Sequence, residues 1–197
     1  MLKKLAFATL LSANAFAMHN AEINLNETDI EAAITLDAGQ FNDAVDPDTT
    51  FFGFRFLKSD PASSNQTQIN NYFEGNFHVQ NTVGSLTDLQ IGIGVKVAYS
   101  TFPGDRQFIA VPLGMNLSYA LPTQDFVPLY LEGMVYYAPQ VLSFSDAKNF
   151  FEYKVNFDIE PIDRARITMG YRRIDTRYTD IDVTLNESWF VGVKFKF

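Results

Sequence analysis

The sequence predicts an all-β protein, an antiparallel transmembrane β-barrel of ten strands, with eight strands as the alternative. Apolar and polar residues alternate in segments of about 9–12 residues, the length that a tilted strand needs to cross a bilayer. The last segment is NESWFVGVKFKF, in which every second residue from Trp189 to Phe197 is apolar. No run of 18 apolar residues occurs, so the sequence offers no transmembrane helix.

The composition limits the classes of function. The chain has 197 residues, of which 47% are hydrophobic and 15% aromatic, enough for one folded domain. It contains no Cys, which excludes disulfides, thiolate metal sites and a Cys nucleophile. The net charge of -8 argues against binding nucleic acid through its phosphates.

The first residues, MLKKLAFATLLSANAFA, have the features of a secretory signal peptide. Lys3 and Lys4 precede an apolar run, and Ala15-Phe16-Ala17 fits the small-residue cleavage pattern. We therefore expect a signal peptide over residues 1–17 and a single barrel domain over residues 18–197.

Nine segments alternate clearly, and a tenth is shorter and weaker. The weak segment is Glu22–Asn26, and it decides between ten strands and eight because a bacterial single-chain barrel has an even number. The nine clear segments, in order, cover residues 30–38, 52–56, 73–80, 89–99, 109–119, 129–137, 151–160, 166–172 and 189–197.

The connections follow from this order. With both termini on the inner side, we expect outer loops at 59–70, 101–106, 138–149 and 175–187. Inner turns are expected at 82–88, 121–126 and 161–165, together with an unusually long inner connection at 39–49. Outer loops longer than inner turns are typical of bacterial barrels.

A soluble β-sandwich also alternates, but two features favour the membrane barrel. Sandwich strands are typically only about 5–6 residues long. The aromatic residues gather near segment ends, as two interfacial belts require; they are Phe52, Phe73, Tyr99, Tyr119, Tyr137, Phe151, Tyr171, Trp189 and Phe197.

The polar faces of these segments predict a charged lumen. Alternation assigns equal numbers of basic and acidic residues to it: Arg55, Lys96, Lys154, Arg166, Arg172, Lys194 and Lys196 against Glu31, Asp37, Glu74, Glu132, Glu152, Asp158 and Glu160. Because an unpaired charge in a confined space is costly, we expect ion pairs and a plugged interior. The alternative is a narrow passive channel in which some of these residues set selectivity.

Signals for catalysis are weak. His78 lies on the lumen face beside Glu74 and Asn76, where it is expected to be a hydrogen-bonding partner more often than a general base. The fragment Ser143-Phe144-Ser145-Asp146 has hydroxyls and a carboxylate without a nearby His. No GxSxG, HExxH or P-loop occurs, so we expect no catalytic, cofactor or metal site, with an outer-membrane hydrolase as the weakest alternative.

Several cations fall at or beyond the outer strand ends, namely Lys58, Arg106, Lys148, Arg173 and Arg177. They are candidates for contacts with the phosphates of lipopolysaccharide in an anionic outer leaflet. Ordinary solvated loop charges are an equally good interpretation.

Two resemblances add to this reading. The terminal strand, with Trp189, Val191, Val193, Phe195 and Phe197, resembles the segment by which the barrel assembly machinery recognises bacterial outer-membrane barrels. From Glu22 to Phe197 the chain resembles the YfaZ family of predicted outer-membrane proteins, most specifically at Tyr136-Tyr137-Ala138-Pro139 and Gly170-Tyr171-Arg172. The resemblance implies an outer-membrane location, without an established activity or cofactor, and we expect a monomeric barrel in the Gram-negative outer membrane.

Overall fold

The computed structural model describes residues 19–60, 71–84, 86–101, 107–123, 127–178 and 182–197. Within these ranges no helix is both long and apolar enough to cross a membrane. The expected signal peptide lies outside the described residues. The strands are β1 (Asn20–Leu25), β2 (Asp29–Asp37), β3 (Thr50–Ser59), β4 (Asn71–Val83), β5 (Leu86–Thr101), β6 (Gln107–Ala110), β7 (Leu113–Leu121), β8 (Leu129–Ala138), β9 (Ser143–Ser145), β10 (Asn149–Ile162), β11 (Ala165–Arg177) and β12 (Asp182–Lys196).

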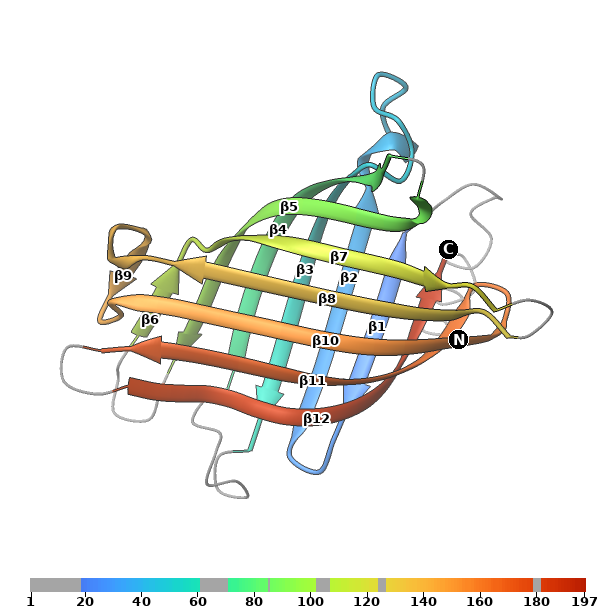
Figure 1. Cartoon of the computed structure of the whole chain (residues 1–197). Coiled ribbons are helices and arrows are strands. Elements are labelled where there is room, and N and C mark those ends of the chain that lie inside the picture. The colour runs from blue at the N-terminus through green and yellow to red at the C-terminus, as the bar shows by residue number, and fades with distance from the viewer. Residues whose placement is uncertain (1–18, 61–70, 85, 102–106, 124–126, 179–181) are drawn as a thin grey trace, which may run out of the picture.

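Ten of these strands form a closed antiparallel barrel (Figure 1). Around the ring the order is β1, β2, β3, β4, β5, β7, β8, β10, β11 and β12, and β12 pairs again with β1. The weakly alternating segment is therefore a wall strand, since β1 pairs with β2 on one side and with β12 on the other. Ten strands are confirmed, and the alternative of eight is wrong.

Two short strands, β6 and β9, extend one end of the barrel. β6 pairs with the end of β5, and β9 pairs with β6. The chain from β6 to β7 is interrupted at Val111-Pro112, where proline supplies no N–H for a ladder. A one-turn 3-10 helix, Gln140–Leu142, precedes β9, so the predicted loop 138–149 is largely structured.

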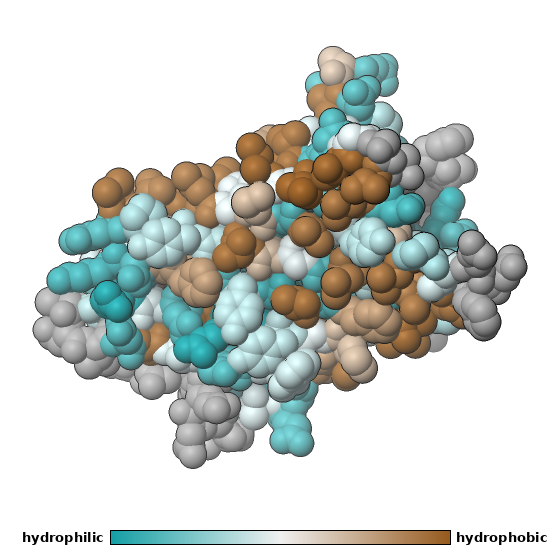
Figure 2. All heavy atoms as spheres, in the orientation of Figure 1, coloured by the Kyte–Doolittle hydropathy of each residue, from teal (hydrophilic) through white to brown (hydrophobic). Residues whose placement is uncertain are grey.

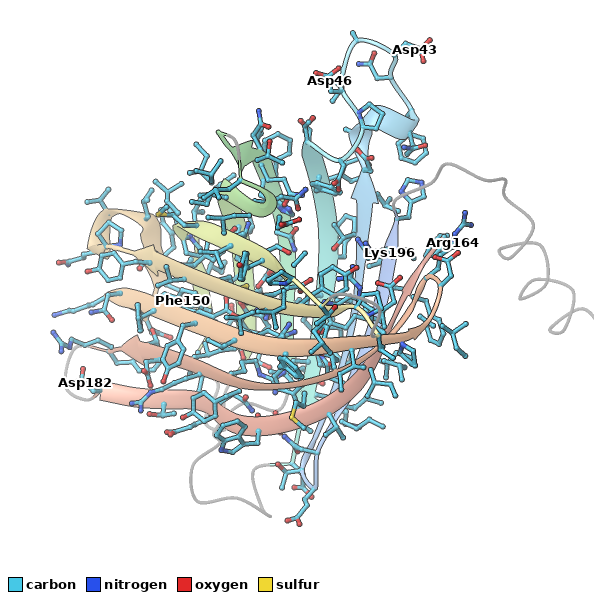
Figure 3. The ribbon with its side chains drawn as sticks, turned by 45° about the vertical axis from the view of Figure 1, so that its right-hand side comes forward. Asp43, Asp46, Phe150, Arg164, Asp182 and Lys196 are labelled. Atoms are coloured by element: carbon cyan, nitrogen blue, oxygen red, sulfur yellow. The ribbon has the colours of Figure 1, made fainter. Side chains whose placement is uncertain are left out.

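The two ends of the barrel differ, and we name them inner and outer after the predicted topology. At the inner end, His19 and Phe197 exchange backbone hydrogen bonds of 3.1 and 2.9 Å, so the first and last described residues meet. The inner connection after β2 begins with a 3-10 helix, Ala38–Gln40. Figure 3 places Arg164 and Lys196 at this end and Asp182 at the opposite, outer end.

The surface of the barrel wall that faces away from the lumen is apolar. Ile93 is 67% exposed and Trp189 is 75% exposed, as side chains that face lipid would be. Figure 2 shows hydrophobic side chains along the wall and hydrophilic ones gathered at the left-hand end, where Figure 1 places β6 and β9. Together with the closed ladder, which leaves no strand edge unpaired around the ring, this wall identifies a membrane-spanning barrel.

Outward-facing rings form a belt near the outer end. Their centroids are 4.9–6.4 Å apart in two runs, Phe56-Phe73-Tyr99 and Phe151-Tyr153-Tyr171-Trp189. Aromatic side chains prefer the level of lipid headgroups, so the belt marks the outer edge of the apolar band.

Beyond the belt, the polarity of the strands is reversed. On β11 the polar Arg173 and Asp175 occupy the outward positions, while Ile174 between them is fully buried. The predicted outer loop 175–187 is therefore mostly wrong, because β11 continues to Arg177 and β12 starts at Asp182. Likewise, most of the predicted turn 82–88 belongs to β4 and β5.

Candidate functional site: the barrel lumen

The lumen has three parts from the outer end inward. An apolar core includes Leu57, Phe108, Phe150, Ile174 and Leu185. Below it lies an ionic layer, which we define as Glu31, Arg55, Glu74, Lys96, Glu152, Lys154 and Arg172. Beneath that layer an inner cavity extends to the inner end. All the ionic-layer side chains are buried, because alternate positions of each strand face inward.

Glu152 on β10 is the centre of one half of the ionic layer. Its carboxylate accepts hydrogen bonds from Arg55 on β3 and from Lys96 on β5, the latter at 2.9 Å. Glu74 on β4 lies 2.5 Å from Arg55 and 3.3 Å from Lys96. Four strands separate β3 from β10 in either direction around the ring, so the Arg55–Glu152 pair spans the lumen.

Glu31 on β2 is the centre of the other half. It accepts hydrogen bonds from Lys154 at 2.7 Å and from Arg172 at 2.5 Å. Arg55 Nη1 lies 3.7 Å from Glu31, which joins the two halves. Each carboxylate therefore faces at least two cations, the arrangement that makes burial of charge tolerable.

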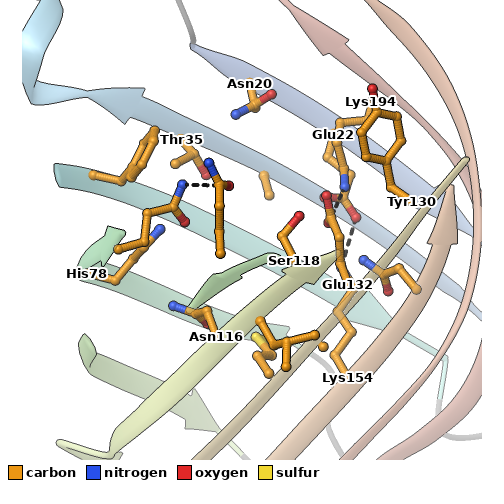
Figure 4. A pocket seen from close by; sticks show the side chains of 18 of the residues that line it. Asn20, Glu22, Thr35, His78, Asn116, Ser118, Tyr130, Glu132, Lys154 and Lys194 are labelled. Carbon is orange, nitrogen blue, oxygen red and sulfur yellow. Dashed lines mark hydrogen bonds and ion pairs between the residues drawn. The ribbon is translucent and has the colours of Figure 1, made fainter. Parts of the chain in front are cut away.

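A third group of charges lies closer to the inner end. Lys194 donates hydrogen bonds to Glu132 at 2.6 Å and to Asp158 at 2.7 Å. Arg166 lies 3.3 Å from Glu132 and 2.8 Å from Glu160. Figure 4 shows Glu132 and Lys194 in the wall of the cavity.

Inward-facing aromatic rings flank these cations. Lys96 Nζ lies 4.0 Å from the centroid of Tyr136, and the guanidinium carbon of Arg166 lies 3.4 Å from that of Tyr130. Both distances suit cation–π attraction. Gly114 provides room for Tyr136, because a Cβ at this position would lie 2.5 Å from the nearest ring atom.

The apolar core was not predicted from the sequence. Phe108 on β6 stacks on Phe150 on β10 with centroids 5.3 Å apart, and both side chains are fully buried. Two pairs of adjacent residues, Phe150-Phe151 and Phe56-Leu57, place apolar side chains on both faces of their strands, and this pattern in the sequence indicates the core. A lumen filled with water would not favour that pattern.

The inner cavity has a volume of about 420 Å³. Arg55, Glu74 and Lys96 of the ionic layer line it at one end, and Asp88 and Lys196 line it near the inner end. Much of its wall between them consists of amide and hydroxyl side chains, including Asn116 and Ser118 (Figure 4).

The family model described as YfaZ precursor matches residues 2–197. The chain belongs to the YfaZ family. No curated protein matches the chain in sequence. Among solved structures, the barrel is similar to the outer membrane channel DcaP of Acinetobacter baumannii, with 12% identity and a TM-score of 0.36. That similarity covers 89% of this chain and 54% of the channel, so the YfaZ chain spans about half the length of the protein it matches.

Two predicted lumen residues of this YfaZ protein have other roles. His78 stacks on Phe51 with centroids 5.0 Å apart, while Glu74 binds Arg55 and Lys96. The buried Asp37 caps the inner connection and accepts hydrogen bonds from the backbone of Gly39 and Asp48. In the fragment Ser143-Phe144-Ser145-Asp146, which was considered for catalysis, the Ser143 hydroxyl donates a hydrogen bond to the backbone oxygen of Pro139. Among the described residues, no group of His and acidic side chains has the arrangement of a metal site.

The outer-end cations of the YfaZ barrel differ in their partners. Arg173 binds Asp175 at 2.7 Å, and Arg177 forms a hydrogen-bonded ion pair with Asp182. Lys58 is exposed, and Arg106 lies outside the described residues. Of the proposed assembly signal, Trp189, Val191, Val193 and Phe195 are exposed on the wall, and the Phe197 ring meets His19 edge-on at 5.7 Å.

Proposed function

We propose that this YfaZ protein is a monomeric, non-enzymatic barrel of the Gram-negative outer membrane, exported with a cleaved signal peptide over residues 1–17. The apolar wall and the aromatic belt support membrane insertion. The alternating C-terminal strand supports recognition by the barrel assembly machinery. With His78 stacked on Phe51 and Glu74 engaged by two cations, a hydrolase remains the weakest alternative.

We infer that the lumen is closed and that the protein acts through its outer end, in a structural or surface-interaction role. The observation that carries this proposal is the Arg55–Glu152 pair, which joins opposite walls of the ring beneath a packed apolar core. Such a barrel presents its loops and the strand ends beyond the aromatic belt to the exterior. The exposed Lys58 is available there for the phosphates of lipopolysaccharide.

A narrow passive channel is the second candidate, and the inner cavity is the observation that favours it. A channel needs this cavity to continue to the outer end, through the positions that the ionic layer and the apolar core occupy. The two proposals therefore differ in whether water reaches the outer half of the lumen.

Because the chain has no Cys, single-cysteine variants test this difference directly. We expect a water-soluble thiosulfonate reagent to modify Ser118→Cys in the cavity of the folded barrel. It should modify Ile174→Cys in the apolar core only after unfolding, since a buried thiol is shielded from the reagent. Asp182→Cys, an exposed position at the outer end of β12, serves as the accessible control. Modification of Ile174→Cys as fast as Asp182→Cys would support the channel.

A further inference from the structure

The inner cavity carries a set of polar groups that the closed-barrel proposal does not use. Amides from three neighbouring strands line it: Asn76 and Gln80 on β4, Gln90 on β5, and Asn116 on β7. A side-chain amide has two N–H donors and an oxygen that accepts two hydrogen bonds. A wall of amides can therefore bind groups that both donate and accept, as hydroxyls do.

The side-chain amides are held in place by hydrogen bonds to their neighbours, and some of their donors remain available for a ligand. Gln80 donates to Gln90 Oε1 at 3.3 Å, and Gln90 donates to Asp48 Oδ2 at 3.1 Å. Asn116 shares hydrogen bonds with the Tyr136 hydroxyl at 3.0 and 3.2 Å. By the valence of the amide, these contacts leave Gln90 a second N–H.

The cations at the floor and in the middle of the cavity already have partners within the barrel, whereas Asp88 and Lys196, near its inner end, form no ion pair with a described residue. Lys96 binds Glu152, Lys154 binds Glu22, and Lys194 binds Glu132, at 2.6–2.9 Å. A charged ligand would have to compete with these pairs and then be buried without compensation of its own charge. The deep part of the cavity, away from Asp88 and Lys196, therefore suits a solute that is polar and carries no net charge.

One wall of the inner cavity contains the flat imidazole ring of His78. Phe51 backs His78 with an interplanar angle of 17° and fixes the orientation of the imidazole (Figure 4 shows His78). The face of an aromatic ring attracts polarised C–H groups, such as those on the flat side of a pyranose. The volume of about 420 Å³ is at the small end of ligand pockets.

We propose that the inner cavity is a binding site for a small neutral saccharide, of mono- or disaccharide size, with the amides of β4, β5 and β7 binding its hydroxyls. The ionic layer forms the floor of the site, so the ligand enters from the inner end. Identifying that end with the periplasm rests on the proposed function, but binding itself does not.

Isothermal titration calorimetry of the mature barrel, in micelles of a detergent without a sugar headgroup, tests the site. Both ends are accessible in a micelle, so the result is independent of whether the barrel conducts. The neutral probes are lactose and N,N′-diacetylchitobiose. Each is paired with a charged analogue of similar size: lactobionate, which carries a carboxylate, for lactose, and chitobiose, which carries protonatable amines, for N,N′-diacetylchitobiose. We expect at least one neutral disaccharide to bind saturably with a Kd of about 1 mM or tighter. It should bind at least about tenfold more tightly than its charged analogue.

The double variant Gln90→Leu/Asn116→Leu removes two amides from the wall and should weaken binding at least about tenfold. Asn81→Leu makes the same chemical change at an exposed position on β4 and should bind as the parent does. Should the double variant fail to fold, His78→Ala, which removes the ring and leaves the amides, takes its place with the same expected loss. The absence of saturable binding by both neutral probes would overturn the proposal. Tighter binding of a charged analogue, or unchanged binding by the variants, would also overturn it.

Discussion

Replacing Glu152 with Ala should cost about 3–5 kcal/mol of barrel stability, as expected when one partner of a buried ion pair is removed. Glu152 is fully buried and bridges Arg55 and Lys96. Its loss leaves Glu74 as the acceptor that both cations share. Urea unfolding of the barrel in lipid vesicles, followed by tryptophan fluorescence of Trp189, measures the change.

Two controls separate burial from charge in this experiment. Asp182→Ala removes a carboxylate from an exposed ion pair with Arg177 and should leave the unfolding curve unchanged. Adding Lys96→Met to Glu152→Ala should restore part of the stability, because it removes one of the two cations that lost a partner. If Glu152→Ala unfolds like the parent, the ionic layer does not hold the lumen together.

Replacing Phe150 with Ala should cost about 3–5 kcal/mol, in the range found for aromatic residues removed from packed cores. Phe150 is fully buried and stacks on Phe108 inside the barrel, whereas its neighbour Phe151 is 38% exposed in the aromatic belt. Phe151→Ala is the matched control, and the same urea titration should show a clearly smaller loss. Equal losses would mean that the outer half of the lumen contains no packed core.

The sequence predicted which face of each strand points into the lumen, because alternation is a local property of the chain. Arg55, Lys96 and Lys154 all lie on the inward face to which their parity assigned them. The weak segment Glu22–Asn26 also corresponds to a wall strand, as the preference for an even strand number above nine clear segments indicated.

Sequence reasoning could not predict which charges pair. Lys154 and Glu31 are 123 residues apart, and their contact depends on the ring order and register of the barrel. Ile174 was missed for a different reason. Alternation was interpreted with lipid on one face along the whole strand, but beyond the aromatic belt the outward face of β11 meets water. There the rule for soluble sheets applies, and the apolar residue points inward.

The conductance of the mature chain in a planar lipid bilayer, at low and high salt, tests the closed lumen most directly. The structure predicts no discrete current steps from a demonstrably inserted barrel, because the Arg55–Glu152 pair and the apolar core occupy the path. Glu132→Gln and Lys154→Gln variants are measured alongside, since both residues line the inner cavity. Discrete steps in the parent protein, with an ion selectivity that changes in these variants, would contradict the account and establish an open channel.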